Sequence, residues 1–243
     1  RIWRKRTSHN VPDAPYGHDG RWRWLIFDLD FGFGLFGKSP DKDTLKMATE
    51  INSTAWNNPP WSTMMLRRLL KNDAFETKFI NRFCDLLNSN YKEDNVMRKL
   101  DAMQQMYQPY VPEHIKRWNL HKGDIGGWLK EIEIMREYVK LRPVAVRGHI
   151  QDYFDLSAPV KLKLNKSEGG MMRLNSLTIT SSDWEGLYFR EIPITLEAMP
   201  EEGYCFAGWK GAAIDSKHPE LTIHLASDAE IQAVFQKEVD IES

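Results

Sequence analysis

Two carboxylates at a spacing of two residues, Asp28 and Asp30, have the type and arrangement that could bind a metal ion. They end the segment "RWRWLIFDLD" (residues 21–30), whose alternating large side chains predict a β-strand. Residues i and i+2 of a strand face the same side, so both carboxylates point the same way. Two such groups repel each other unless a hard cation such as Mg²⁺, which also accepts phosphate oxygens, lies between them. The alternative is a hairpin turn rich in Asp and Gly that binds nothing.

Three glycines follow the acids, and they fit two phosphate-binding motifs. Gly32, Gly34 and Gly37 spell G-x-G-x-x-G, but a dinucleotide-binding unit also needs a second strand, and the next hundred residues have helical periods only. Residues 32–39 also spell the P-loop pattern G-x-x-x-x-G-K-S. A P-loop helix begins at its Lys-Ser pair, and here Pro40 disfavours a helical conformation of the residue before it. Both motifs are therefore weaker interpretations than the carboxylate pair.

The acids also form part of a third motif. Asp30, Phe31 and Gly32 are the D-F-G triplet, in which a kinase Asp holds Mg²⁺ against the phosphates of ATP. Three letters alone are not specific, so the triplet supports a metal site without deciding its chemistry.

Composition narrows the possible functions. The 243 residues carry a net charge of −1, which argues against an overall nucleic-acid-binding protein. The sequence contains no run of about 18 apolar residues, so it predicts no transmembrane segment. Cys84 and Cys205 are too few for a disulfide framework or a cysteine-ligated metal, and the seven histidines lack metal-ligand spacing. His18, beside Asp19, is the one histidine that we connect with a nucleotide site.

Helical periods extend from about residue 41 to 155. Asp73 and Glu76 have the spacing of a capping box before an apolar stripe. A later stripe runs from Trp128 to Val139 and stops before Pro143. Proline suits the first turn of a helix, so this pattern predicts that one helix ends there and another begins.

The period changes to two after residue 157. Alternating apolar and polar residues predict strands, which are "VKLKLN", "ITLEA", "LTIHL" and "IQAVF". The net charge also changes, from +5 over residues 1–156 (25 basic, 20 acidic) to −6 over residues 157–243 (8 basic, 14 acidic). We therefore predict an α+β protein, with a helical part and a small β-ribbon in residues 1–156 and a small antiparallel β domain in residues 157–243.

Several stretches together resemble the CotH kinase family, the spore coat protein H-like atypical protein kinases. They occur in the family's order over about residues 1–156, and they are "RIWRKR", "APYGHDGRWRWLIFDLDFGFG", "LLKNDAFETKFINRFCDLLN", "VPEHIKRW" and "YVKLRPVAVRGHIQDYF". The resemblance implies a kinase-like C-lobe and, in the intact protein, transfer of phosphate from Mg²⁺-ATP to protein hydroxyl groups. Carried over, Asp28 and Asp30 bind the metal and the cofactor, with Asp30 favoured by the D-F-G match and Asp28 nearly equal.

This chain departs from a complete kinase of that family. There, the lobe that covers the nucleotide and the catalytic-loop Asp and Asn precede the position of "RIWRKR". The resemblance therefore implies a C-terminal portion that is inactive by itself and has no catalytic residue of its own. The alternatives are a non-catalytic bacterial surface or adhesion protein on the same scaffold, and a P-loop nucleotidase.

The tail resembles a divergent internalin-type B-repeat. The stretch "YFREIPITLEAMPEEGYCFAGWKG" carries a G-Y-x-F-x-G-W core, and "LTIHLASDAEIQAVFQ" supplies the closing strands. Such modules are small β folds on bacterial surface proteins. Together the two resemblances imply an extracellular or cell-surface location, with a protein substrate or surface partner that the sequence does not identify.

Overall fold

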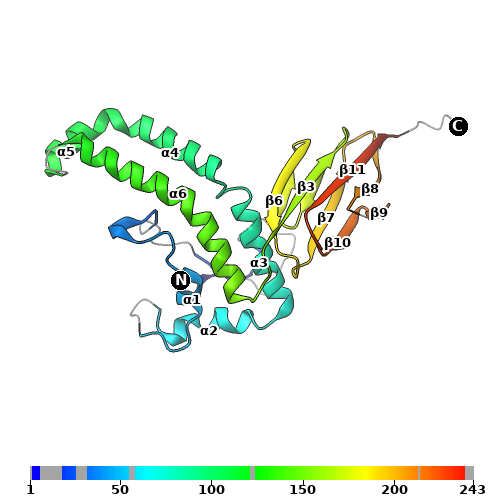
Figure 1. The fold of residues 1–243 in the computed structure, drawn as a ribbon, viewed down its shortest axis with the longest axis horizontal. Coiled ribbons are helices and arrows are strands. Elements are labelled where there is room, and N and C mark those ends of the chain that lie inside the picture. The colour runs from blue at the N-terminus through cyan, green and yellow to red at the C-terminus, as the bar shows by residue number, and fades with distance from the viewer. Residues whose placement is uncertain are drawn as a thin grey trace. The chain divides into compact units, whose positions relative to one another are not determined.

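The computed structural model describes residues 2–5, 18–25, 32–54, 58–120, 124–212 and 214–238. The chain divides into two compact units, residues 1–39 and residues 40–243. Figure 1 shows the helices of the second unit, followed along the chain by its strands.

The first unit contains the expected β-ribbon. Strand β1 (Ile2–Trp3) pairs antiparallel with β2 (Arg23–Trp24), with Ile2 opposite Trp24. The strand predicted over residues 21–30 is seen here only as β2, and residues 26–31 lie outside the described part of the chain. A short 3₁₀ helix, η2 (Leu35–Gly37), follows.

The helices of the second unit agree with the predicted helical region. They are α1 (Thr44–Thr49), α2 (Pro60–Leu69), α3 (Asp73–Leu87), α4 (Glu93–Tyr107), η3 (Gln108–Tyr110), α5 (Val111–Trp118) and α6 (Ile125–Tyr153). Helices α4 and α6 lie side by side (Figure 1). None of the helices in the described ranges is both long and apolar enough to cross a membrane.

Helix α3 begins one residue away from the predicted cap. The side chain of Asn72, rather than Asp73, accepts a hydrogen bond from the Phe75 N–H at 3.0 Å. Asp73 and Glu76 instead lie in the first turn, where negative charge is favourable at the positive end of the helix dipole. The capping-box pattern thus located the helix start correctly but assigned the cap to the neighbouring residue.

Helix α6 corrects the prediction of a break at Pro143. It continues through that proline, although proline removes one main-chain hydrogen bond from a helix interior. Contacts on both sides of Pro143 offset this loss. Val139 and Ile150 are buried, and the Arg142 guanidinium donates a hydrogen bond to the Pro40 carbonyl at 2.6 Å. Tertiary packing therefore overrides the local signal.

The strands of the second unit form two sheets. They are β3 (Val160–Lys166), β4 (Gly170–Leu174), β5 (Leu177–Ile179), β6 (Asp183–Tyr188), β7 (Ile194–Pro200), β8 (Tyr204–Gly211), β9 (Ile214–Ser216), β10 (Glu220–Ile223) and β11 (Ala229–Lys237). One sheet has the order β10-β7-β4-β5 and is antiparallel, and the other has the order β6-β3-β11-β8-β9. In the second sheet β3 and β11 pair in parallel, whereas the other neighbours are antiparallel. The four predicted strands correspond to β3, β7, β10 and β11.

One hydrophobic core extends from the strands to the helices. Ile80 and Cys84 of α3 and Ile150 of α6 are at most 1% exposed, and they belong to the same buried cluster as Leu162 and Trp209 of the strands. The change from helix to strand falls between Tyr153 and Val160, beside the predicted boundary at 157. Helices and strands of this unit therefore stabilise each other. The division into two separate domains at residue 157 stays a prediction.

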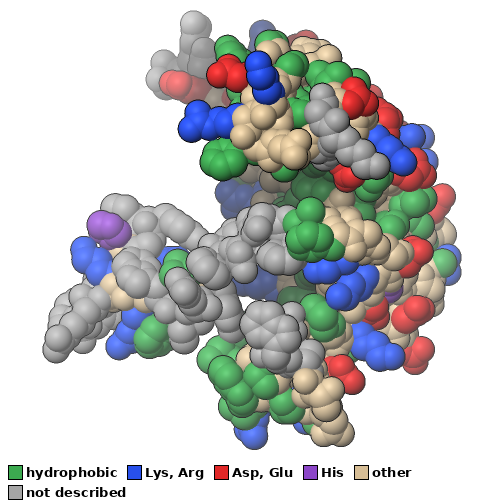
Figure 2. Space-filling view, turned by 90° about the vertical axis from the view of Figure 1, so that its left-hand side faces the viewer, with side chains coloured by type: hydrophobic (Ala, Val, Ile, Leu, Met, Phe, Trp, Pro, Cys, Tyr) green, Lys and Arg blue, Asp and Glu red, His purple; other side chains and the backbone are tan. Residues whose placement is uncertain are grey.

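The surface of the helices is mixed in character. Figure 2 shows acidic, basic and hydrophobic side chains interspersed over the described part of one face. Large apolar side chains such as Trp61 of α2 and Trp118 of α5 are among the exposed ones, at 77% and 60%.

Candidate functional site

The predicted metal-binding acids lie in the first unit. Asp28 and Asp30 fall in residues 26–31, outside the described part of the chain, so their geometry stays a prediction. The described residues on either side form the two ends of this segment. Strand β2 precedes it, and a turn beginning at Gly32 follows it.

A partly buried ion pair fixes the approach to β2. The two terminal nitrogens of Arg23 donate to the two carboxylate oxygens of Asp19, each at 2.7 Å, and the Arg21 N–H donates to the same carboxylate at 3.2 Å. Asp19 is only 7% exposed. The hydrogen bonds from Arg23 hold the pKa of Asp19 at about 2, so this carboxylate is ionised at neutral pH. A two-pronged pair of this kind sets the geometry of the chain at Arg23, five residues before Asp28.

The basic residues of the ribbon have partners within their own unit. The Lys5 ammonium lies 3.3 Å from Nδ1 of His18, and the Arg4 guanidinium lies 4.8 Å from the centre of the Trp22 ring. These contacts connect the segment after β1 with the segment before β2, where His18 directly precedes Asp19 in the sequence. Among the residues that the structure describes, no group of three His, Cys, Asp or Glu side chains could hold a metal.

The glycine segment forms a tight turn rather than a P-loop. The Leu35 N–H bonds to the Gly32 carbonyl at 3.2 Å and the Lys38 N–H to the Gly34 carbonyl at 3.1 Å. Gly34 and Gly37 have φ of 79° and 69°, a left-handed conformation that glycine adopts without a steric penalty.

The conformation after the turn contradicts the P-loop interpretation. Lys38 is extended, with φ of −69° and ψ of 125°, so no helix begins at the Lys-Ser pair. The next helix, α1, starts at Thr44, where the Asp43 side chain caps it by accepting from the Lys46 N–H at 2.8 Å. The dinucleotide interpretation also fails, because the described residues between Lys38 and Val160 contain no strand.

The comparisons with known proteins decide the family. A family model described as CotH kinase protein matches residues 5–146. This chain belongs to the CotH kinase family. A second model, the divergent InlB B-repeat domain, matches residues 178–239. Neither the curated proteins nor the solved structures include a significant match.

The CotH region (residues 5–146) and the strands that follow it (residues 160–237, here called the β module) meet at Asp85 of α3. This carboxylate has no exposed surface. It accepts hydrogen bonds from the Tyr188 hydroxyl at 2.8 Å, from the Ser176 N–H at 3.0 Å, and from the Asn175 amide at 3.3 Å. The Ser176 hydroxyl donates to it as well. Because four donors converge on one carboxylate, its role in this CotH-family chain is to join α3 to the strands.

A polar side chain at the C-terminal cap of α3 binds the main chain of β6. The Asn88 amide donates to the Leu187 carbonyl at 2.9 Å and accepts from the Leu187 N–H at 3.0 Å. Arg147 of α6 also donates to the Asn88 oxygen, at 2.8 Å. Asn88 therefore takes the place of a neighbouring strand at this point.

The same interface shifts several pKa values. Burial raises the pKa of the Cys84 thiol to about 12, so Cys84 stays protonated and unreactive. Burial and the neighbouring Asp85 raise the pKa of Tyr188 well above its usual value, which keeps its hydroxyl a donor. Desolvation lowers the pKa of Arg147.

Sequence analysis missed this interface, although α3 carries a signal. Asn81, Asp85 and Asn88 recur at steps of four and three, so they share one helix face within an otherwise apolar stripe. Asn81 completes the row by donating to the Pro193 carbonyl at 2.8 Å. Buried polar groups need partners, so such a row predicts contact with main-chain or side-chain groups of another element.

Proposed function

We propose that the intact protein is a kinase that transfers phosphate from Mg²⁺-ATP to protein hydroxyl groups, and that this chain contributes the segment containing Asp28 and Asp30. The observation that carries the proposal is the CotH kinase match, which spans residues 5–146 and includes this segment. The Gly32–Ser39 turn supports it indirectly, because the competing P-loop interpretation requires a helix that the turn does not form.

The chemistry of the donors fits a hard cation. Mg²⁺ prefers carboxylate and phosphate oxygens, and when bound it neutralises charge on the phosphates of the nucleotide. The chain's own part is to supply Asp28 and Asp30 as ligands. The Asp19–Arg23 pair and the turn at Gly32 hold the chain on either side of them.

The test measures transfer of labelled phosphate from ATP by the intact protein. We expect Asp30→Asn to abolish transfer, because a neutral amide cannot supply the ligand charge. Asp28→Asn should abolish it as well, or nearly so. The matched control is Asp152→Asn, an exposed carboxylate of α6, which should leave transfer unchanged. Thermal melts check folding, and full activity in Asp30→Asn overturns the assignment.

A second candidate is a non-catalytic bacterial surface or adhesion protein that keeps the kinase scaffold. The observation that favours it is the divergent InlB B-repeat match over residues 178–239. Both family matches are compatible with a surface or spore-coat protein, and an extracellular location is part of either proposal. Intact protein that binds cells equally well with and without Asp28 and Asp30, and that transfers no phosphate, supports this second candidate.

A further inference from the structure

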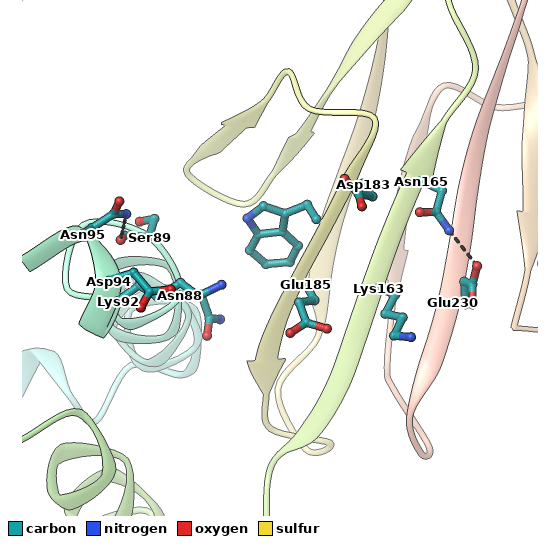
Figure 3. A pocket seen from close by; sticks show the side chains of 11 residues that line it. Asn88, Ser89, Lys92, Asp94, Asn95, Lys163, Asn165, Asp183, Glu185 and Glu230 are labelled. Carbon is teal, nitrogen blue, oxygen red and sulfur yellow. Dashed lines mark hydrogen bonds between the residues drawn. The ribbon is translucent and has the colours of Figure 1, made fainter. Parts of the chain in front are cut away.

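We propose that the edge of β6 binds an extended basic peptide, which adds to the sheet as a further strand. Strand β6 is the first strand of the order β6-β3-β11-β8-β9, so only one of its two sides is paired with another strand. A cleft of about 650 Å³ is lined by β6, by the end of α3 with the start of α4, and by Lys163, Asn165 and Glu230 of β3 and β11 (Figure 3). Ligand sites of proteins commonly have volumes of this order.

The hydrogen-bond register shows which main-chain groups face the cleft. In an antiparallel pair, residues alternate between bonding the partner strand and pointing away from it. Leu187 points away from β3, because both its N–H and its carbonyl bind Asn88. Glu185 and Asp183, two and four residues earlier, point the same way. Ser182, one residue before Asp183, points the opposite way, because its carbonyl accepts a hydrogen bond from the N–H of Lys166, the last residue of β3.

Four main-chain groups are therefore available to a ligand. They are the N–H and carbonyl groups of Asp183 and Glu185. These groups point away from β3, and the described residues provide no hydrogen-bond partner for them on the cleft side. An unpaired edge of this kind is a template for another strand. Asn88 already occupies the next position along the edge, so it fixes where an added strand must stop.

The charges around the cleft select the kind of peptide. Its lining includes the four acids Asp94, Asp183, Glu185 and Glu230 against the two bases Lys92 and Lys163, and the Lys161 ammonium lies 3.8 Å from the Glu185 carboxylate. The labelled acids lie on both the helix side and the strand side of the cleft (Figure 3). Side chains directly opposite one another on neighbouring strands interact, and opposite charges are favourable there. A lysine or arginine opposite Asp183 or Glu185 would thus be stabilised.

The side chain of Trp184, between these two acids, points to the opposite face of the sheet. Trp184 lines the cleft, and its ring edge lies over Gly186, where an added Cβ would be only 2.4 Å from the ring. Residues of an added strand alternate in direction, so every second side chain would lie on the side of Trp184. The sequence pattern that fits is a basic residue at every second position, with small or apolar residues between.

A second copy of this chain fits the edge less well. Antiparallel pairing of two β6 strands about Glu185 would place the two Glu185 carboxylates opposite each other, and like charges at such positions are destabilising. Inward or edge charges of this kind are a known protection against self-association of sheets. The acids of β6 therefore disfavour pairing with an acidic strand and favour pairing with a basic one.

The experiment uses residues 1–243 and three fluorescent ten-residue peptides. The first alternates Lys with Thr and Val, the second has Glu in place of every Lys, and the third has the sequence of the first with an N-methyl group on the main-chain nitrogen of every Lys, which removes the N–H groups that would face β6. Binding is measured by fluorescence anisotropy, and the site by the NMR shifts of main-chain amides. We expect the first peptide to bind and to shift the amides of Asp183 and Glu185, and the other two to bind at least tenfold more weakly.

Two variants of the chain locate the site. Glu185→Pro removes an N–H that the sheet does not use, at a position where edge strands tolerate proline, and it should weaken binding at least tenfold without lowering the melting temperature by more than a few degrees. The matched control is Glu202→Gln, an exposed acid in the turn between β7 and β8, which should leave binding unchanged.

Three results overturn the proposal. Equal binding of the N-methylated peptide would show that charge alone is recognised. Unchanged binding by folded Glu185→Pro would place the peptide elsewhere. A dimer of residues 1–243 that becomes monomeric in Glu185→Pro would identify the occupant of the edge as a second copy.

Discussion

Replacing Asp85 by alanine tests whether the buried carboxylate joins the CotH region to the β module. The substitution removes the acceptor of four hydrogen bonds at a site with no exposed surface. It leaves the Tyr188 hydroxyl without its partner on a residue with no exposed surface, and it also removes the acceptor of Asn175 and of the exposed Ser176. The Tyr188 hydroxyl cannot turn to water, so for this donor the loss is larger than the net value of the bond itself.

The magnitude follows from the number of groups left without a partner. A buried donor that loses its acceptor costs about 1–3 kcal/mol. Tyr188 is such a donor, and the three other bonds to the carboxylate are each worth about 0.5–1.5 kcal/mol net, so we expect Asp85→Ala to lower the free energy of unfolding by about 3–5 kcal/mol. In a chain of this size, each kcal/mol lost from the free energy of unfolding lowers the melting temperature by about 2–4 °C. The melting temperature of Asp85→Ala should therefore fall by roughly 10 °C. Tyr188→Phe removes one donor only and should cost about 1–2 kcal/mol.

The assay is urea unfolding of residues 1–243 at neutral pH, followed by circular dichroism. Asp152→Ala, at an exposed position of α6, is the control for loss of a carboxylate and should change stability by less than about 0.5 kcal/mol. The double variant Asp85→Ala with Tyr188→Phe should be less destabilised than the sum of the two, because both changes remove the same bond. If Asp85→Ala lies within 1 kcal/mol of the parent chain, the carboxylate does not hold the two parts together.

Three further outcomes are expected. Residues 1–156 alone should lose cooperative melting by circular dichroism, because the truncation exposes the buried faces of α3 and α6, and a sharp melt at the parent temperature would contradict this. The pKa of Asp19 is lowered from 3.8 to about 2, so its stabilising effect is complete above pH 4 and is lost as the pH falls toward 2; NMR titration should show this pKa returning toward 3.8 in Arg23→Ala. Gly186→Ala should lower the melting temperature, since its Cβ would lie 2.4 Å from the Trp184 ring, and an unchanged melt would show that the ring moves aside freely.

The parts of the fold that sequence analysis predicted correctly depend on local periodicity. The alternation in "VKLKLN" and "IQAVF" gave β3 and β11, because one face of each strand is buried and the other is not. The continuous course of α6 was not predictable from Pro143 alone. It depends on Arg142, whose partner Pro40 lies about a hundred residues away in the sequence.

The candidate site was predictable only as residue types. The family was identified from five stretches over about residues 1–156, one of which contains Asp28 and Asp30. The family match confirms that identification, whereas the metal site itself stays a prediction. The Asp19–Arg23 pair could have been suspected from its spacing, but a two-pronged contact depends on a turn that residue types do not specify. The donors to Asp85 come from residues 90 and more positions later, so local patterns could not identify them.

The parallel pairing of β3 with β11 has a mechanical consequence. The chain enters the module at the start of β3 and leaves it at the end of β11. Because the two strands run in the same direction, these points lie at opposite ends of the pair, and tension along the chain pulls one strand lengthwise past the other. The five residue pairs from Ala229–Leu162 to Ala233–Lys166 then carry the load together rather than opening one after another. The module is built to resist pulling between its ends, as a link that bears force must do.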